Sequence, residues 1–230
     1  MVPVHSGKSE QDQKMNHDAF IGYLRDRLTK PLPGWDYQQR MSPIIAGNRT
    51  NEPRNIPQDA HQTGVAALLF PGDFGSELIF TIRSQFVSHH KGQISFPGGR
   101  AETHESIIET ALRETHEELG IEESSINVIG KLSSLYVPPS HSHMHVIVGE
   151  LNQTPVFQPS LQEVEEVFSV SLHALAFQHE IIHLPKMRAQ DIEVLAPCWP
   201  IHPKNHLWGA TAMCVSELIG LYTDFMHENQ

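Results

Sequence analysis

The sequence predicts an α+β fold, an α/β/α sandwich in which a mixed β-sheet is packed between helices. Two observations lead to this prediction. Helical and strand patterns alternate along the chain in the order helix, strands, helix, strands, helix. The 230 residues, 39% of them hydrophobic, suffice for one domain with a full core and would be a tight fit for two.

The N-terminal segment predicts a tail, a helix and an arm. Residues 1–16 are polar and are expected to form a mobile tail, so that the single domain spans residues 17–230. Apolar residues at helical spacing predict a helix from Asp18 to about Leu28. Residues 31–62 are rich in Pro, Asn, Gln and Arg, and are expected to form an extended arm or loop.

Short apolar runs predict the strands. Gly64–Phe70 and Glu77–Ile82 flank the turn sequence PGDFG and predict a hairpin. Further strands are expected at Val128–Leu132, Met144–Leu151 and Val164–Val170.

The last part of the chain predicts two helices around an insertion. Ser171–Phe177 is expected to begin a short helix, and residues 179–206, with three prolines, to form a long irregular insertion. A closing helix is predicted from Ala210 to about Phe225. Its inward residues are expected to be Ala212, Val215, Leu218, Ile219 and Tyr222.

Composition narrows the classes of function. The net charge of −11 argues against binding to nucleic acid, which needs a basic face. The sequence has no apolar run of the ~18–20 residues that a membrane span needs, and its N-terminus does not resemble a secretory or transit signal, so a cytoplasmic location is expected. Cys198 and Cys214 are expected to be reduced, buried residues.

A second long helical pattern is strongly acidic. Eight glutamates lie between positions 102 and 123, balanced only by Arg100 and Arg113. Glu114, Glu117 and Glu118 have i, i+3 and i+4 spacing, which places their carboxylates on one face over one turn. Such an oxygen-rich site suits Mg²⁺ or Mn²⁺ better than zinc.

Arg113 and the apolar face of the helix support the interpretation as a metal site. Arg113 is four residues from both Glu109 and Glu117 and can pair with either. The alternative interpretation is a solvated acidic face without a ligand. The preceding Gly98-Gly99 turn favours a site, because it allows close approach of a ligand to the backbone. The inward stripe of the helix is Ile108, Ala111, Leu112, Thr115 and Leu119, and Gly120 is expected to end the helix.

Residues 99–121, GRAETHESIIETALRETHEELGI, resemble the Nudix box, G-x5-E-x7-R-E-U-x-E-E-x-G-U, where U is a bulky aliphatic residue. Thr115 stands at a position that is usually aliphatic, and its β-branched side chain is expected to keep the packing. The positions that match are Gly99, Glu105, Arg113, Glu114, Glu117, Glu118, Gly120 and Ile121.

The resemblance implies a Nudix fold, in which the box forms a loop–helix–loop. It also implies a bound Mg²⁺ or Mn²⁺, held chiefly by Glu114, Glu117 and Glu118. The carbonyl of Gly98 or Gly99 is a further candidate ligand.

The implied reaction is attack of water on a diphosphate linked to another group, with the metal lowering the pKa of water. Glu117 or Glu118 is expected to accept the proton. Glu105 is expected to support the loop and to pair with Arg113 or with the water around the metal. The predicted catalytic residues are therefore Glu105, Arg113, Glu114, Glu117 and Glu118.

The residues before the box point to a substrate. Positions 78–99, LIFTIRSQFVSHHKGQISFPGG, resemble the additional signature of the coenzyme A pyrophosphatases, roughly L-L-T-x-R-S-x3-R-x3-G-x3-F-P-G-G. Residues 206–212, HLWGATA, resemble the start of the closing helix in the same subfamily. Ser88 departs from the signature, which has Arg there, and Lys91 or Arg100 is a candidate to compensate.

This resemblance implies cleavage of coenzyme A into 3′,5′-ADP and 4′-phosphopantetheine. Arg83 and Lys91 are candidates for contacts with the phosphates, and the alternative for Arg83 is an ion pair with a glutamate. The alternatives are another nucleoside diphosphate such as ADP-ribose, or a ligand-sensing module without catalysis. The expected partner is a small nucleotide, not a membrane or a nucleic acid, and a homodimer is left open. The expected substrate-binding residues are Arg83, Ser84, Lys91, Gly98, Gly99 and Arg100.

One further pattern lies outside both signatures. His141, His143 and His145 alternate, so on a strand they would share one face. Such a row could bind zinc, but a polar strand face or loop is the commoner meaning.

Overall fold

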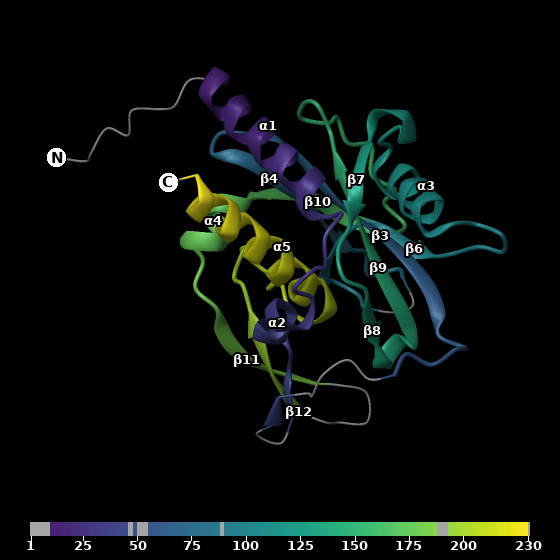
Figure 1. Ribbon diagram of the computed structural model, residues 1–230. Helices are drawn as coiled ribbons and strands as arrows, with labels where there is room; N and C mark the ends of the chain where they lie inside the picture. The colour runs from purple at the N-terminus through teal and green to yellow at the C-terminus, as the bar shows by residue number, and fades with distance from the viewer. Residues whose placement is uncertain (1–9, 46–47, 50–54, 88–89, 188–192, 230) are drawn as a thin grey trace.

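The protein is described by a computed structural model, which covers residues 10–45, 48–49, 55–87, 90–187 and 193–229. Its centre is an eight-stranded mixed sheet (Figure 1). The strands of this sheet are β3 (His61–Gly72), β4 (Gly75–Arg83), β5 (Ile94–Ser95), β6 (Gly98–Arg100), β7 (Asn127–Lys131), β8 (Leu135–Val137), β9 (Ser142–Glu150) and β10 (Val164–Ser171). The order along the sheet is β10-β4-β3-β9-β7, and β3 and β9 are parallel whereas the other neighbours are antiparallel.

Helices cover both faces of this sheet (Figure 1). The helices are α1 (Glu10–Arg27), α2 (Trp35–Gln38), α3 (Ile107–Leu119), α4 (Leu172–Phe177) and α5 (Gly209–Glu228), with 3₁₀ turns at Gln39–Met41, Glu123–Ser125 and Pro138–Ser140. Alternate residues of β3 point to opposite faces. Val65 and Leu69 pack in a core with α1 and α5, whereas Ala66 and Leu68 pack against α3. The predicted α/β/α sandwich with a mixed sheet is confirmed.

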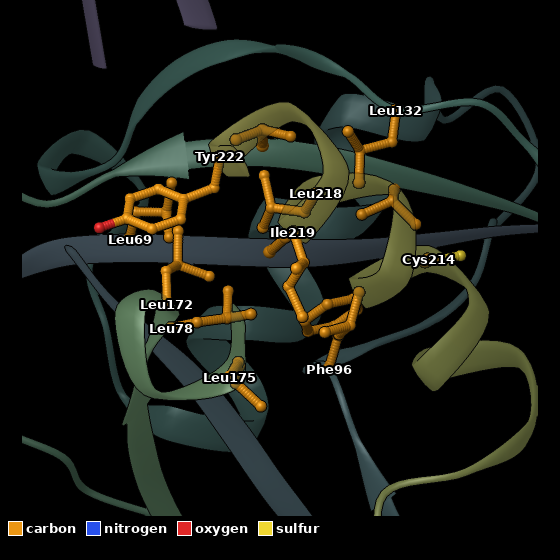
Figure 2. Packing of buried hydrophobic residues seen from close by; sticks show 14 of the residues in the cluster. Leu69, Leu78, Phe96, Leu132, Leu172, Leu175, Cys214, Leu218, Ile219 and Tyr222 are labelled. Atoms are coloured by element: carbon orange, nitrogen blue, oxygen red, sulfur yellow. The ribbon is translucent and has the colours of Figure 1, made fainter. Parts of the chain in front are cut away.

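The closing helix α5 lies in the larger core, as its apolar pattern predicts. Figure 2 shows Leu218, Ile219 and Tyr222 of this helix among residues of β3, β4 and α4. All five residues predicted to point inward are buried. Cys198 and Cys214 are both free and buried, as expected from the absence of a disulfide pattern.

The N-terminal helix is longer than the sequence predicts. It begins at Glu10 instead of near Asp18, so residues 10–16, which were expected to belong to the tail, are helical. The apolar periodicity starts only at Phe20, because residues 10–19 are polar apart from Met15 and Ala19. The remaining part of the predicted tail, residues 1–9, lies outside the described residues.

The two segments expected to be irregular meet in a second, four-stranded sheet. Its strands are β1 (Ile44–Ile45), β2 (Asn48–Arg49), β11 (Ile182–Met187) and β12 (Glu193–Cys198), in the order β11-β12-β1-β2. The predictions of an arm at 31–62 and an irregular insertion at 179–206 are therefore corrected. Prolines within β11 and β12 hid these strands, although Val194, Ala196 and Cys198 alternate along β12 and are buried.

A buried carboxylate fastens the arm to the closing helix. Glu217 of α5 is fully buried and accepts hydrogen bonds from the backbone N–H of Gly34 at 3.1 Å and from Nε2 of Gln38 at 2.9 Å. Ser133 donates to the same carboxylate from its hydroxyl at 2.7 Å.

None of the helices in the described part of the chain combines the length and apolar character that crossing a bilayer requires.

Candidate active site

The acidic helix α3 is defined at both ends by local sequence. At its N-terminus, Ser106 and Glu109 form a reciprocal capping box, and at its C-terminus Gly120 adopts the left-handed conformation with φ 69°. The predicted end at Gly120 is confirmed. Thr115, which departs from the aliphatic pattern, is fully buried, and its hydroxyl donates to the carbonyl of Ala111 at 2.7 Å. The departure therefore leaves no polar atom of Thr115 without a partner.

Glu118 is the most deeply buried carboxylate on this helix. It is 2% exposed, and one of its oxygens lies 3.6 Å from Nη1 of Arg83 at the end of β4. Its other oxygen accepts a hydrogen bond from the backbone N–H of Gly98 at 3.3 Å. Burial nevertheless raises the pKa of Glu118 to about 8, because one partly exposed arginine and one amide do not replace full hydration.

Two other carboxylates lie next to Glu118. Oxygens of Glu114, Glu118 and Glu163 all lie within 4.8 Å of one another. Burial also raises the pKa of Glu114. Hard oxygen donors gathered at this spacing match the preference of Mg²⁺ and Mn²⁺, and a divalent cation would supply the positive charge that the group lacks. The residues present therefore fit a divalent metal.

Glu163 was not predicted, because its position depends on contacts between distant segments. Val164 pairs with Arg83 across β10 and β4, and the backbone N–H of Ser84 donates to the carbonyl of Glu163 at 2.8 Å. The N–H of Ser160 donates to the carbonyl of Glu118 at 3.0 Å and so attaches this loop to the end of α3. In the sequence, Glu163 is one of three neighbouring glutamates with nothing local to distinguish it.

Arg113 holds a second group of carboxylates. Its Nε lies 2.8 Å from Glu105, and its Nη1 lies 3.0 Å from both Glu114 and Glu117. Of the two pairings that the spacing allowed, the structure contains the one with Glu117, whereas Glu109 accepts from the backbone of the cap. The three contacts make Arg113 the link between the loop and the metal-facing side of the helix.

Glu105 fixes the loop that precedes α3. Besides Arg113, it binds the backbone N–H of Glu102 at 2.9 Å and the hydroxyl of Thr110 at 2.8 Å. The hydrogen bond from Arg113, more than any other contact, lowers the pKa of Glu105 to about 2. This arrangement agrees with the loop-supporting role that the resemblance implies.

Glu117 does not join the group formed by Glu114 and Glu118. Its side chain is 53% exposed and binds Arg113, and the described acidic group that could hold an ion contains Glu163 in its place. The three helical carboxylates therefore do not form one group in this structure, and the role of Glu117 as a metal ligand stays a prediction. Residues at i and i+4 remain aligned along a helix, whereas the residue at i+3 is rotated to the other side of the same face.

The predicted glycines lie against these carboxylates. A Cβ atom at Gly99 would collide with the carboxylate of Glu114, and one at Gly98 would collide with the carbonyl of Gly64. Gly98 also has φ 148°, in the region that favours glycine. The turn therefore permits β6 to lie close to the acidic face.

The remaining predicted substrate-binding residues do not all lie at one site. Of these, Arg83 alone among the described residues lines the open cleft beside the carboxylates. Ser84 is 3% exposed, and its hydroxyl accepts from the backbone N–H of Phe86 at 3.1 Å. Lys91 and Arg100 are exposed, and the carbonyl of Arg100 accepts from Arg113 at 3.4 Å.

The cleft itself has a volume of about 640 Å³. Its lining is Arg83, Phe86, Val87, Gln162 and Glu163. Ser88, where the sequence departs from the signature, lies outside the described residues.

Two of the alternating histidines, His143 and His145, lie on β9, whereas His141 precedes the strand at the end of a 3₁₀ turn. The rings of His143 and His145 lie 4.1 Å apart on β9, and their Nε2 atoms are paired with Ser134 at 2.9 Å and with Gln62 at 3.0 Å. His141 is paired with the hydroxyl of Tyr136 at 2.8 Å. Among the described residues, the groups of side chains close enough to share a metal ion do not include these histidines, which favours the polar interpretation over the zinc site.

Comparison with known proteins agrees with this geometry. The NUDIX domain model matches residues 60–196. Two curated relatives are named mitochondrial coenzyme A diphosphatase NUDT8. The chain is 37% identical to the one from Mus musculus over 61% of this chain and 68% of the relative, and 34% identical to the one from Homo sapiens over 59% and 58%.

A wider match and a solved structure extend the similarity. Nudix hydrolase 3 from Caenorhabditis elegans is 27% identical over 82% of this chain and 85% of the relative. The crystal structure of the Nudix hydrolase RenU from M. smegmatis has a TM-score of 0.51 at 15% identity, and covers 79% of this chain and 94% of that chain. The fold, the box and the family match together show that the chain belongs to the Nudix hydrolase family.

Proposed function

We propose that this protein hydrolyses the diphosphate bond of coenzyme A or a derivative, with Mg²⁺ or Mn²⁺, to give 3′,5′-ADP and 4′-phosphopantetheine. The observation that carries the proposal is the group formed by Glu114, Glu118 and Glu163, three carboxylates next to one arginine at the edge of an open cleft. The substrate is proposed from the residues at 78–99 and from the names of the NUDT8 relatives.

The proposed division of labour follows from burial and pairing. Glu114, Glu118 and Glu163 would hold the cation, with the Gly98 turn beside them. When bound there, a divalent cation neutralises phosphate oxygens and increases the electrophilicity of phosphorus. Arg83 lies at the wall of the cleft, where its guanidinium can bind a phosphate oxygen.

The proton of the attacking water needs a carboxylate that is ionised near neutral pH. Glu118 is proposed to hold the cation, which leaves it unavailable as the proton acceptor. Glu117 is more exposed and lies against Arg113, and its carboxylate is the proposed proton acceptor. Replacement of Glu117 by Gln would therefore lower kcat without abolishing binding of the cation.

The test is hydrolysis of coenzyme A with Mg²⁺ or Mn²⁺, with the products separated by chromatography and EDTA as the control. Metal-dependent release of 3′,5′-ADP and 4′-phosphopantetheine is the expected result. Cleavage of ADP-ribose but not of coenzyme A would support the Nudix chemistry and contradict the proposal that coenzyme A is the substrate. Binding of either compound without cleavage would favour a ligand-sensing module.

Location and assembly are proposed separately from the chemistry. The expected cytoplasmic location is tested by fractionation of cells that express the tagged chain, and recovery with mitochondria would reject it. The homodimer left open by the sequence is tested by light scattering of the purified protein.

A further inference from the structure

An aromatic side chain stands unusually open beside the reacting groups. Phe86 is 84% exposed, more than any other large hydrophobic residue of the described chain. It lines the same cleft as Arg83 and Glu163. Arg83 contacts Glu118, and Glu163 belongs to the proposed metal site, so the cleft is continuous with the place where the diphosphate would lie.

The position of Phe86 is tied to the site by backbone contacts. The backbone N–H of Phe86 donates to the hydroxyl of Ser84 at 3.1 Å, and the N–H of Ser84 donates to the carbonyl of Glu163 at 2.8 Å. The backbone of Phe86 is thus connected through Ser84 to the backbone of Glu163, whose carboxylate belongs to the proposed metal site. A group bound against Phe86 would be held in a defined position relative to the diphosphate.

The rest of the lining combines apolar and polar groups. Val87 adds apolar surface, and Gln162 brings a side-chain amide with two donors and an acceptor. The pantetheine half of coenzyme A carries amides that could also bond to Gln162, but it has no flat face to lie against the ring of Phe86. A planar ring with polar edges matches both features, because its face can stack on Phe86 while its edge meets Gln162.

We propose that Phe86 stacks on the nucleobase of the substrate, with Gln162 hydrogen-bonding to the edge of that base. The inference deepens the proposed function and rests on it, because it assigns the nucleotide half of the substrate to the Phe86 side of the cleft. Phe86 is accordingly a specificity-determining residue for the base, separate from the carboxylates that act on the diphosphate.

The test measures binding of each half of coenzyme A by calorimetry with Mg²⁺ present. The probes are 3′,5′-ADP and 4′-phosphopantetheine, and the variants are Phe86→Ala, Phe86→Leu and Phe86→Tyr. Loss of stacking is expected to weaken 3′,5′-ADP binding about 5- to 150-fold in the Ala and Leu variants and little in the Tyr variant. Binding of 4′-phosphopantetheine is expected to be unchanged. Phe74→Ala, at an exposed phenylalanine in the β3–β4 turn, is the matched control.

Three outcomes would overturn the stacking assignment. These are unchanged 3′,5′-ADP binding in Phe86→Ala, full retention in Phe86→Leu, or weakening confined to 4′-phosphopantetheine. Hydrolysis of coenzyme A by the unmodified protein is assayed alongside. If hydrolysis occurs but the Phe86 variants bind 3′,5′-ADP normally, the proposal that Phe86 stacks on the base is wrong and the proposed function stands. If hydrolysis is absent but Phe86→Ala and Phe86→Leu weaken nucleotide binding, the substrate assignment fails and stacking stands.

Discussion

The guanidinium of Arg83 lies 3.6 Å from the carboxylate of Glu118, and this contact joins the end of β4 to the last turn of α3. Arg83 is the cation that lowers the pKa of Glu118, yet burial outweighs it. The acidic group is therefore short of positive charge in the metal-free protein. The first prediction depends on this imbalance.

Replacing Glu118 by Gln should have opposite effects on stability and activity. Because burial raises the pKa of Glu118 to about 8, folding at pH 7 requires this carboxylate to take up a proton, and the neutral Gln side chain removes that cost. The free energy of unfolding in EDTA should therefore rise by about 1–3 kcal/mol at pH 7. The same change should lower kcat by roughly 10²-fold or more, because a proposed metal ligand is lost. Urea unfolding in EDTA and the coenzyme A assay measure the two effects. The exposed Glu122→Gln should change neither, and an unchanged kcat in Glu118→Gln would remove this residue from the mechanism.

Glu163→Gln tests the ligand that comes from outside the helix. The substitution keeps the shape of the side chain but removes one of three charged oxygen donors, so the affinity for Mn²⁺ should fall about 10-fold or more. Titration of the protein with Mn²⁺, followed by electron paramagnetic resonance, measures the affinity directly. Glu166→Gln, three residues further along the chain, is the control. Equal Mn²⁺ affinities in the two variants would show that Glu163 does not hold the metal.

The two glycines of the turn should respond differently to alanine. At Gly99 the added Cβ meets the flexible carboxylate of Glu114, so metal affinity should fall while stability changes by less than ~1 kcal/mol. At Gly98 the Cβ meets backbone atoms of Gly64 and Val65 at a positive φ, which should cost at least ~2 kcal/mol. Thermal unfolding and Mn²⁺ titration of both variants separate the effects. The prediction fails if Gly99→Ala is the less stable of the two.

Arg113→Lys should show that the geometry of the guanidinium matters as well as its charge. Lysine cannot bind Glu105, Glu114 and Glu117 together, because it lacks the planar array of donors. The free energy of unfolding should fall by about 1–3 kcal/mol, and kcat should fall as well. Denaturant unfolding and the coenzyme A assay provide the measurements. Arg100→Lys, at an exposed position, should leave stability unchanged, and an equal loss in both variants would contradict the prediction.

His145 should make the protein sensitive to mild acid. Burial first, then His143 and Lys131, lower its pKa from 6.5 to about 4. Between these values the unfolded chain binds the proton more readily than the folded protein does, so stability is fully present above pH 6.5 and is lost as the pH falls toward 4. His145→Gln should reduce this loss in unfolding curves between pH 7 and pH 4. The exposed His227→Gln should not, and identical pH profiles for the three proteins would exclude His145 as the cause.

Local sequence was sufficient where helical geometry alone decides which residues meet. The box at 99–121 predicted α3, its end at Gly120, and the alignment of Glu114 with Glu118, because each depends on spacing within a few turns. The family, the mixed sheet and the two-sided core also followed from patterns of that kind. The features of the box depend on spacing alone, whereas the sheet was predicted as a class and without a strand order.

The features missed from the sequence depend on long-range pairing. Glu163 reaches Glu118 because β10 pairs with β4 and its loop attaches to the end of α3, and both contacts bring together residues far apart in the chain. The small sheet likewise joins β1 to β12, two segments whose prolines and short length conceal their strand character. Glu117 lies against Arg113, because spacing gives a shared face but not the direction in which Arg113 draws the side chain, and its role as a metal ligand stays a prediction. Which carboxylates meet, and which aromatic ring is left open beside them, depends on packing between elements, since the local chain is compatible with several arrangements.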